Sequence, residues 1–259
     1  MISIIIPVLN EEASIAKLLE HLLINSSPKY VSEIILIDGG STDDTQNIIK
    51  NYVAVNNAEN VETLFYQNLE TKRAVSNTDV NLKTNITLLH SKKGRAKQMN
   101  LGAKSASSEI LYFLHADSFP PKNFDKLIIN EVKKNNKAGC FRMQFDSNHW
   151  WLRLASWLTQ FSWRACRGGD QSQFITKTLF NDIGGFDERF FIYEDNILIN
   201  ALYARKQFVV INKKLQTSAR LYRKHGVWKL QYHFWTIYVK KWFGATAEEL
   251  LAYYKKNIY

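Results

Sequence analysis

Three short runs along the chain are apolar on both faces and predict buried β-strands. They cover residues 2–6, 33–38 and 110–115. Segments with apolar residues at helical spacing lie between and after these runs, at 13–23, 45–53, 96–106 and 124–135. Strands that are apolar on both faces fit a parallel sheet covered by helices. The order of the elements therefore predicts an α/β fold with a doubly wound, mostly parallel sheet and helices on both faces.

The remaining segments have weaker patterns. Residues 54–83 are polar, rich in Asn and without a clear period, so we predict a surface insert with a short strand at 63–66. Residues 140–145 alternate like an antiparallel strand, and 150–163 predict a helix that carries four of the seven tryptophans. In residues 227–243, eleven of seventeen are apolar, but lysines interrupt them. This segment is too broken by charge to span a membrane and predicts an interfacial or docking helix.

Composition narrows the class of protein. With 46% apolar residues in a chain of 259, the main state is folded rather than disordered. Two cysteines, Cys140 and Cys166, exclude a disulfide framework or a four-thiolate zinc site and favour a reducing compartment. The apolar core of residues 1–12 is too short for a signal peptide or a membrane span. We expect a cytoplasmic protein, and a peripheral position at the inner face of a membrane stays open.

The net charge of +10 is confined to the end of the chain. Residues 1–200 contain 22 basic and 22 acidic residues, whereas residues 201–259 contain 12 basic and 2 acidic residues. This asymmetry predicts a surface that meets anions, such as phosphorylated substrates, anionic lipids or nucleic acid, and a solvated basic helix is the alternative. The aromatic residues of this region recur at spacings of three to four: Trp228, Tyr232, Trp235, Tyr238 and Trp242. We expect this aromatic stripe to meet a membrane surface, the sheet domain or a second subunit, and we expect no nucleic-acid partner.

Polar residues follow each predicted strand, where an open parallel sheet binds its ligands. PVLNEE starts at Pro7, DGGSTDDT starts at Asp38, and HADS starts at His115. The first turn lacks the glycine fingerprint of a dinucleotide-binding domain, and no Walker lysine loop is present. A nucleotide would have to be held by another arrangement.

Three of these positions suggest specific chemistry. Asp38 ends a buried strand, where an unpaired carboxylate is costly, so we expect a partner with N–H donors such as a nucleobase edge. Residues 92–96 (KKGRA) open a helix, and cations at a helix N-terminus predict diphosphate binding. His115 and Asp117, two positions apart at a strand end, would share one side of the pleat and suit a divalent cation.

Six motifs in this order resemble the inverting family-two glycosyltransferases of the GT-A fold. They are PVLNEE, DGGSTDDT, GRAKQMNLGA, FLHADS, GGFDE and YEDNIL. LHADS, GGDQSQF and SARLYRKHGVW resemble more narrowly the radical-SAM/selenodomain-associated transferases. The resemblance covers residues 1–245 apart from the insert at 54–83, and six ordered motifs are far more specific than any one of them.

The resemblance implies transfer of a sugar, with inversion, from a nucleotide-diphosphate sugar to an acceptor hydroxyl, assisted by Mn²⁺ or Mg²⁺. It implies a donor half at 1–118, an acceptor half at 119–225 and a helical extension at 226–259. Asp195 would be the general base, and Asp117 would bind the metal that bridges the diphosphate. The nucleotide-binding residues implied are Pro7, Asn10, Glu11, Asp38, Gly94, Arg95, Gln98 and Asp117. The acceptor stays unidentified, and a lipid-linked hydroxyl is one candidate.

The chain departs from the family pattern at two positions. His115 stands where most relatives carry Asp, so its part in metal binding stays open. Ile197 stands where a second acidic residue commonly follows the base, which leaves Glu194 as the nearest substitute. Candidates for the acceptor site or for a clamp on the diphosphate are Asp170, Gln171, Arg220, Arg223 and His225.

Other functions remain alternatives at this point. A glycoside hydrolase would need two carboxylates flanking the bond, for which Asp170 and Asp195 are candidates. We rank it lower because it gives Asp38 and the His115 to Asp117 triplet no role. A nucleotide-binding or membrane-docking protein that kept the fold and lost catalysis is the main alternative, and nucleic-acid binding ranks third.

Overall fold

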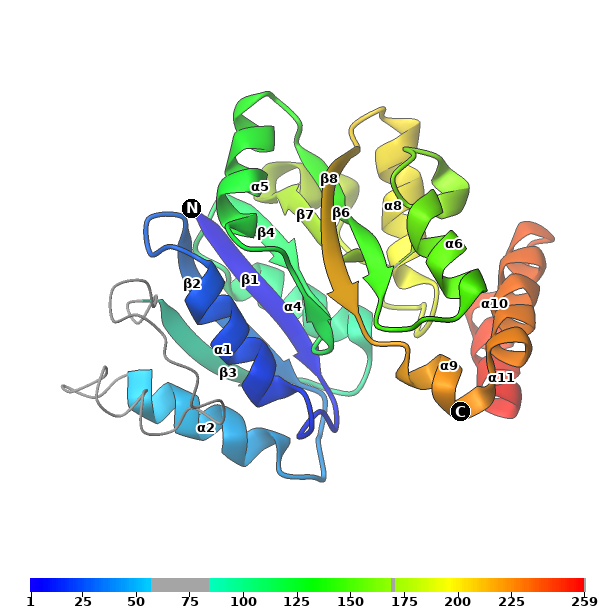
Figure 1. Cartoon of the computed structure of the whole chain (residues 1–259), viewed down its shortest axis with the longest axis horizontal. Coiled ribbons are helices and arrows are strands. Elements are labelled where there is room, and N and C mark those ends of the chain that lie inside the picture. The colour runs from blue at the N-terminus through cyan, green and yellow to red at the C-terminus, as the bar shows by residue number, and fades with distance from the viewer. Residues whose placement is uncertain (57–83, 169–170, 259) are drawn as a thin grey trace.

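The computed structural model describes residues 1–56, 84–168 and 171–258, which are built around an eight-stranded sheet (Figure 1). The strand order is β3-β2-β1-β4-β7-β6-β8-β5. The strands are β1 (Ile2–Val8), β2 (Val31–Asp38), β3 (Asn85–His90), β4 (Ile110–Phe113), β5 (Ser118–Phe119), β6 (Ala138–Phe145), β7 (Gln173–Thr176) and β8 (Val209–Thr217). Strands β3, β2, β1 and β4 are parallel, β7 is antiparallel to both neighbours, and β6 is parallel to β8. The predicted α/β fold with a mostly parallel sheet is confirmed.

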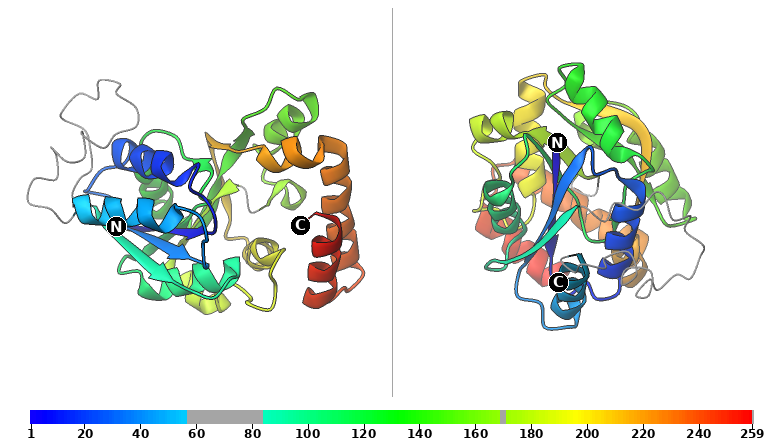
Figure 2. Two further views of the ribbon diagram at one scale, coloured as in Figure 1. Left: turned by 90° about the horizontal axis from the view of Figure 1, so that it is seen from below. Right: turned by 90° about the vertical axis from the view of Figure 1, so that its left-hand side faces the viewer.

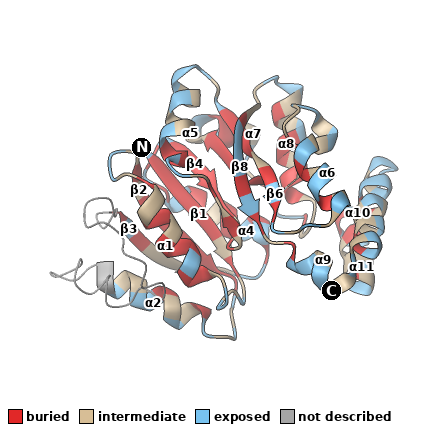
Figure 3. Ribbon diagram, viewed as in Figure 1, coloured by how far each residue is buried: buried red, intermediate tan, exposed pale blue. Residues whose placement is uncertain are grey.

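Helices cover both faces of this sheet. Those on one face are α1 (Ile15–Asn25), α2 (Thr45–Asn56) and α5 (Phe124–Lys133), and those on the other are α4 (Arg95–Ser105), α7 (Lys177–Ile183) and α8 (Glu194–Ala204). The alternation of side chains along β1 explains the two layers, because Ile4 and Ile6 pack toward α1 while Ile5 packs toward α4. Figure 3 shows that the sheet between them is largely buried.

The remaining helices come from residues 150–166 and 220–257. They are α6 (Trp150–Leu158), the 3₁₀ helix η1 (Arg164–Cys166), α9 (Arg220–His225), α10 (Val227–Trp242) and α11 (Ala247–Asn257). Figure 2 shows α10 and α11 side by side at one end of the molecule, where Leu230, Ile237 and Leu250 form a small core of their own with Phe190. Among the described residues, no helix has both the length and the hydropathy that crossing a membrane requires.

Several sequence-based boundaries differ from the structure. Strand β3 was not predicted, because it is an edge strand whose side chains are mostly half-buried or exposed and give no strong apolar run. The helix expected at 150–163 ends at Leu158, so Trp163 follows it. The antiparallel prediction for residues 140–145 was wrong: they belong to β6 and pair in parallel with β8, and the antiparallel pairing with β7 is made by Ala138 and Gly139. The short strand predicted at 63–66 lies outside the described residues.

The position of α4 depends on the missing side chain of Gly102. A Cβ atom there would lie 2.5 Å from Cγ2 of Ile5 and 2.8 Å from Cδ1 of Ile37. Both neighbours are buried in the sheet, so they have little room to move. Glycine therefore lets α4 lie directly on β1 and β2, and this fixes where the first residue of the helix, Arg95, reaches the end of the sheet.

We predict that Gly102→Ala lowers the free energy of unfolding by roughly 1–2 kcal/mol. A contact of 2.5 Å puts the cost of overpacking near the upper end of its usual range of about 1–3 kcal/mol, and alanine returns about 1 kcal/mol as a better helix former. Urea unfolding measures the difference. Lys104→Ala, exposed on the same helix, is the matched control and should change the free energy by no more than about 0.5 kcal/mol. An unchanged or more stable Gly102→Ala protein would contradict the close approach.

Candidate active site

The carboxyl ends of the parallel strands finish level with one another. Val8 pairs with Asp38, and Asp38 pairs with His90. The loops that follow are tied together, since the backbone N–H of Glu11 donates to Thr45 Oγ1 at 2.7 Å. Residues from β1, β2, β3 and β4 therefore meet at one edge of the sheet, as predicted for a ligand site in this type of fold.

Asp38 finds its hydrogen-bond donors within the chain. Its carboxylate accepts bonds from the backbone N–H groups of Gly40 (3.0 Å) and Ser41 (3.1 Å) and from the side chain of Gln46 (3.0 Å). Gly40 has a positive φ of 93°, which permits this turn. The argument that Asp38 needs an outside partner was wrong, because its own loop satisfies it and leaves it 1% exposed. His90, which sequence reasoning missed, lies 3.8 Å away.

Gln98 also differs from its expected position. It was expected to face the nucleotide, but it is only 4% exposed. Its amide nitrogen donates to the backbone carbonyls of Val8 (3.0 Å) and Ile37 (2.7 Å). A buried amide that bonds to two strand ends fixes their relative position, so the role of Gln98 in this structure is to brace the site from beneath.

Other predicted nucleotide-binding residues lie at the surface of the same edge. Asn10 is exposed, and its side-chain oxygen accepts a hydrogen bond from the backbone N–H of Thr42 at 2.8 Å. Pro7 is half-buried within β1, opposite Ile37. Gly94 precedes α4 with a φ of 143°, a conformation that favours glycine.

A guanidinium group from the C-terminal part of the chain links the loop after β1 to the turn after β4. Arg220, at the start of α9, donates from Nη1 to Glu11 at 2.8 Å and forms a second bond to the same carboxylate through Nη2. Its Nε lies 3.5 Å from Asp117 Oδ2. The structure thus brings together three predicted residues that are far apart in the sequence.

The other two basic candidates on α9 are placed differently. Arg223 pairs with Asp146 at 3.0 Å rather than with the cluster of Glu11, Asp117 and Arg220. His225 is half-buried at the end of α9. Of these three candidates, Arg220 is the one that lies beside Asp117.

The turn after β4 carries the residues expected to bind a metal. Strand β4 ends at Phe113, so His115 and Asp117 lie in a turn, and the argument that they share one side of a pleat was wrong. No group of three His, Cys, Asp or Glu side chains in the described ranges could hold a metal ion. The single carboxylate of Asp117 still fits Mg²⁺ or Mn²⁺, which proteins often bind through one carboxylate and substrate phosphates.

A second charged cluster lies where α8 begins. Arg95 Nη1 is 3.3 Å from Glu194 Oε1 and 3.6 Å from Asp195 Oδ2. Glu194 is 1% exposed, and its carboxylate oxygens accept no hydrogen bond from the residues that the structure describes. Burial, followed by the charge of Asp195, raises the pKa of Glu194 to about 8. Burial therefore favours the protonated form of Glu194.

The candidates near residue 170 are not all accessible. Asp170 lies outside the described residues. Gln171, expected near the acceptor, is 4% exposed, and its side chain bonds to Arg167 Nη1 and the Cys166 carbonyl, both at 2.6 Å. Arg167 is itself 3% exposed. Gln171 thus supports the buried side chain of Arg167. No pattern in the sequence indicates this role.

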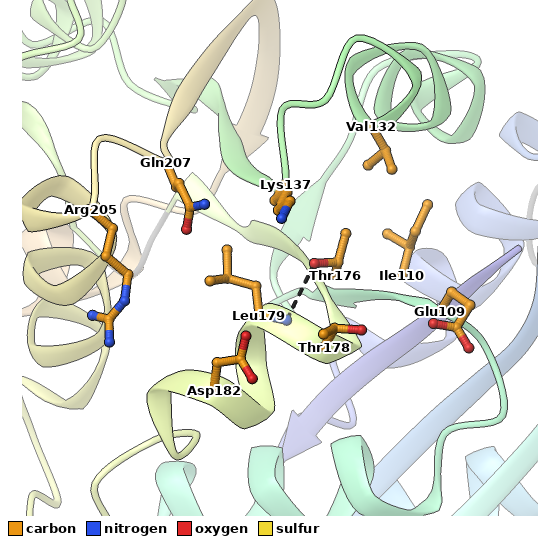
Figure 4. A pocket seen from close by; sticks show the side chains of 10 residues that line it. All are labelled: Glu109, Ile110, Val132, Lys137, Thr176, Thr178, Leu179, Asp182, Arg205 and Gln207. Carbon is orange, nitrogen blue, oxygen red and sulfur yellow. Dashed lines mark hydrogen bonds between the residues drawn. The ribbon is translucent and has the colours of Figure 1, made fainter.

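A pocket of about 660 Å³ opens at the opposite end of the sheet (Figure 4). It lies where β4 starts and β7 ends, beside Ile110 and Thr176. Asp182 and Arg205 point toward it, but none of the predicted site residues lines it. The candidate site is therefore the charged edge at the carboxyl ends of the strands.

The chain is similar in sequence to known glycosyltransferases. The sequence matches the model of glycosyl transferase family 2 over residues 3–200. It is 30% identical over 136 residues to a dolichyl N-acetyl-α-D-glucosaminyl phosphate 3-β-D-2,3-diacetamido-2,3-dideoxy-β-D-glucuronosyltransferase of Methanococcus voltae, covering 52% of this chain and 35% of the relative. It is 29% identical over 119 residues to glycosyltransferase AglE of Haloferax volcanii, covering 46% and 31%. The chain thus spans about a third of the length of these curated relatives.

Solved structures show the same fold. TarS residues 1–349 of S. aureus in complex with UDP has a TM-score of 0.61 at 19% identity, over 84% of this chain and 60% of that one. The mannosyltransferase PcManGT of Pyrobaculum calidifontis, in complex with GDP-Man and Mn²⁺, has a TM-score of 0.58 at 17% identity, over 98% and 63%. These likenesses confirm the GT-A fold. Because the family model covers most of the sequence, the chain belongs to glycosyl transferase family 2.

Proposed function

We propose that the protein transfers a sugar, with inversion, from a nucleotide-diphosphate sugar to an acceptor hydroxyl. The observation that carries this proposal is the cluster of Glu11, Asp117 and Arg220 at the carboxyl edge of the sheet. It offers a cation to a diphosphate and a carboxylate to a metal within one small region. The ligands named in the structural neighbours, UDP, UDP-GlcNAc and GDP-Man with Mn²⁺, support a donor of this class.

In this proposal Asp117 would hold Mn²⁺ or Mg²⁺ together with phosphate oxygens of the donor. The cation supplies positive charge that stabilises the departing diphosphate. Arg220 would bind the same diphosphate, and the contact of its guanidinium with Asp117 supports this role. Asn10, Gly94 and the loop shaped by Asp38 would surround the nucleoside.

Asp195 would take the proton of the acceptor hydroxyl. The acceptor oxygen then forms a bond to the anomeric carbon, while the bond from that carbon to the diphosphate breaks and its electron pair leaves with the phosphate. Arg95 orients Asp195 through its contact at 3.6 Å. Burial raises the pKa of Glu194 beside it, so Glu194 would keep its own proton during this step.

We further propose a lipid-linked acceptor and a division of labour along the chain. The Methanococcus voltae relative is named for a dolichyl phosphate-linked sugar, which supports an acceptor carried on a lipid. Residues 1–118 would hold the donor, 119–225 the acceptor, and 226–259 would form a helical extension. We also propose that the chain belongs to the narrower subgroup of radical-SAM/selenodomain-associated transferases, which some of its motifs resemble.

A protein that binds the donor without turnover is the second candidate. One observation favours it: Asp117 stands without a second acidic residue in its turn, because His115 replaces the usual Asp. Turnover of the donor separates the two candidates.

We predict that Asp195→Asn keeps nucleotide binding but lowers sugar transfer or donor hydrolysis by at least ~100-fold, the usual contribution of a positioned base. Steady-state turnover of UDP- and GDP-sugars with Mn²⁺ measures the rate, and calorimetry with UDP and GDP measures binding. Asp182→Asn, an exposed carboxyl on α7, is the matched control and should turn over donor like the unaltered protein. Equal loss of binding and turnover in Asp195→Asn would assign Asp195 a structural role. No turnover in the unaltered protein, with binding intact, would support the second candidate.

We also predict that Glu194→Gln removes part of the pH dependence of stability. The folded state raises the pKa of Glu194 from its usual 4.5 to about 8, so it retains a proton that the unfolded chain loses. The free energy of unfolding should therefore fall as pH rises from about 5 to about 8. Urea unfolding at these two pH values should show a smaller fall in Glu194→Gln than in the unaltered protein. Glu109→Gln, exposed near the opposite end of the sheet, should show the full fall, and an equal fall in Glu194→Gln would contradict the assignment.

A further inference from the structure

An exposed aromatic face covers one side of α6 and α10. We use this name for Trp150, Leu154 and Trp157 of α6 together with Trp228, Tyr232 and Trp235 of α10. These side chains are 39–62% exposed, although large apolar residues are normally mostly buried. In both helices they follow one another at spacings of four and then three residues, so each helix presents a single stripe. One sequence-based expectation was that the aromatic stripe of α10 would pack against the sheet domain. The structure instead leaves these side chains exposed.

The two stripes form one continuous surface. The ring of Trp228 lies 5.6 Å from that of Trp150 and 5.5 Å from that of Trp151. Trp151 also contacts Trp235 at 5.7 Å, and its indole N–H donates to Gln231 at 3.0 Å. These contacts hold α6 against α10, which Figure 1 shows at the same end of the molecule. A contiguous apolar patch of this kind marks an interaction site, unlike scattered single residues.

The charges around the aromatic face identify its partner. Arg153 and Lys229 are exposed on α6 and α10, and neither helix contains Asp or Glu, whereas Lys240 and Lys241 lie over the rings of Tyr253 and Phe190. A second copy of the chain would place these positive charges against one another. An anionic lipid surface attracts them. Trp and Tyr are also the side chains that concentrate at the interface between lipid and water.

The aromatic face is structurally connected to the candidate active site. Tyr238 of α10 donates from its hydroxyl to the Asn196 side chain at 3.3 Å and packs edge-to-face on Tyr193 at 5.2 Å. Tyr193 precedes Glu194 and Asp195, so α10 links the aromatic face to the start of α8. Helix α9, which carries Arg220, joins α10 at Gly226.

We propose that the aromatic face docks the protein on the surface of an anionic lipid bilayer. Its tryptophans and Tyr232 enter the headgroup region, while Arg153 and Lys229, both exposed, meet lipid phosphates. Docking in this way holds the start of α8 near the bilayer, where a lipid-linked acceptor would be found. This last consequence rests on the proposed function, whereas the docking itself does not.

Sedimentation with lipid vesicles tests the docking in the absence of any sugar donor. The full chain should bind vesicles of phosphatidylcholine mixed with phosphatidylglycerol, and added salt should weaken the binding. Two double variants, Trp150→Gln with Trp228→Gln and Arg153→Glu with Lys229→Glu, should each lower the affinity at least ~10-fold. The matched control is Lys213→Glu with Lys214→Glu on β8, which makes the same charge change at exposed positions and should keep most of the affinity. Thermal unfolding of every variant confirms that it is folded.

Three results would overturn the proposal. The first is that the unaltered protein does not bind anionic vesicles at low salt. The second is that the control on β8 loses as much affinity as the variant at Arg153 and Lys229. The third is a concentration-dependent dimer in analytical ultracentrifugation that Trp150→Gln with Trp228→Gln abolishes, because a second copy would then cover the face. Turnover of soluble donor is measured separately, so failure of the docking and failure of the proposed function remain distinguishable.

Discussion

Parallel pairing of β1 with both β2 and β4 is the constraint on which the rest of this molecule depends. Because these strands point the same way, the loops after Val8, Asp38 and Phe113 leave the sheet at one edge. Buried Gln98 then bonds to the carbonyls of Val8 and Ile37, which prevents the strand ends from sliding apart. All the polar chemistry that we assign to the protein is built on this edge, and the pocket at the other end of the sheet contains none of it.

The charges at this edge are paired within the chain before any ligand arrives. Arg220 lies between Glu11 and Asp117, and Arg95 lies beside Glu194 and Asp195. Both guanidinium groups are about half exposed, so a ligand can reach them, whereas the side chains of Glu11 and Asp195 beside them are 12% and 11% exposed. Such a site keeps its side chains in position without the ligand and remains open to it.

The sequence predicted the fold well where burial is strong and poorly where it is weak. β1, β2 and β4 are buried on both faces and were found from their apolar runs, whereas the half-exposed edge strand β3 was missed together with His90. Charged site residues such as Arg220 were found from motifs, but its contact with Glu11 joins positions 209 residues apart and has no local signal. Gln98 and Gln171 were assigned to ligands because a sequence does not distinguish an amide that bonds to buried partners from one that faces a substrate. The spacing of the aromatic residues did predict the stripe on α10.

Calorimetric titration with UDP and GDP, in the presence and absence of Mn²⁺, tests most directly that the diphosphate and its metal bind at this edge. The account predicts that Mn²⁺ strengthens binding of one of these nucleotides to the unaltered protein at least ~10-fold and that Asp117→Ala abolishes this gain. Asp182→Ala, which alters the pocket at the opposite end of the sheet, should leave the gain intact. A gain from Mn²⁺ that persists in Asp117→Ala but disappears in Asp182→Ala would contradict the account and place the nucleotide at the other end of the sheet.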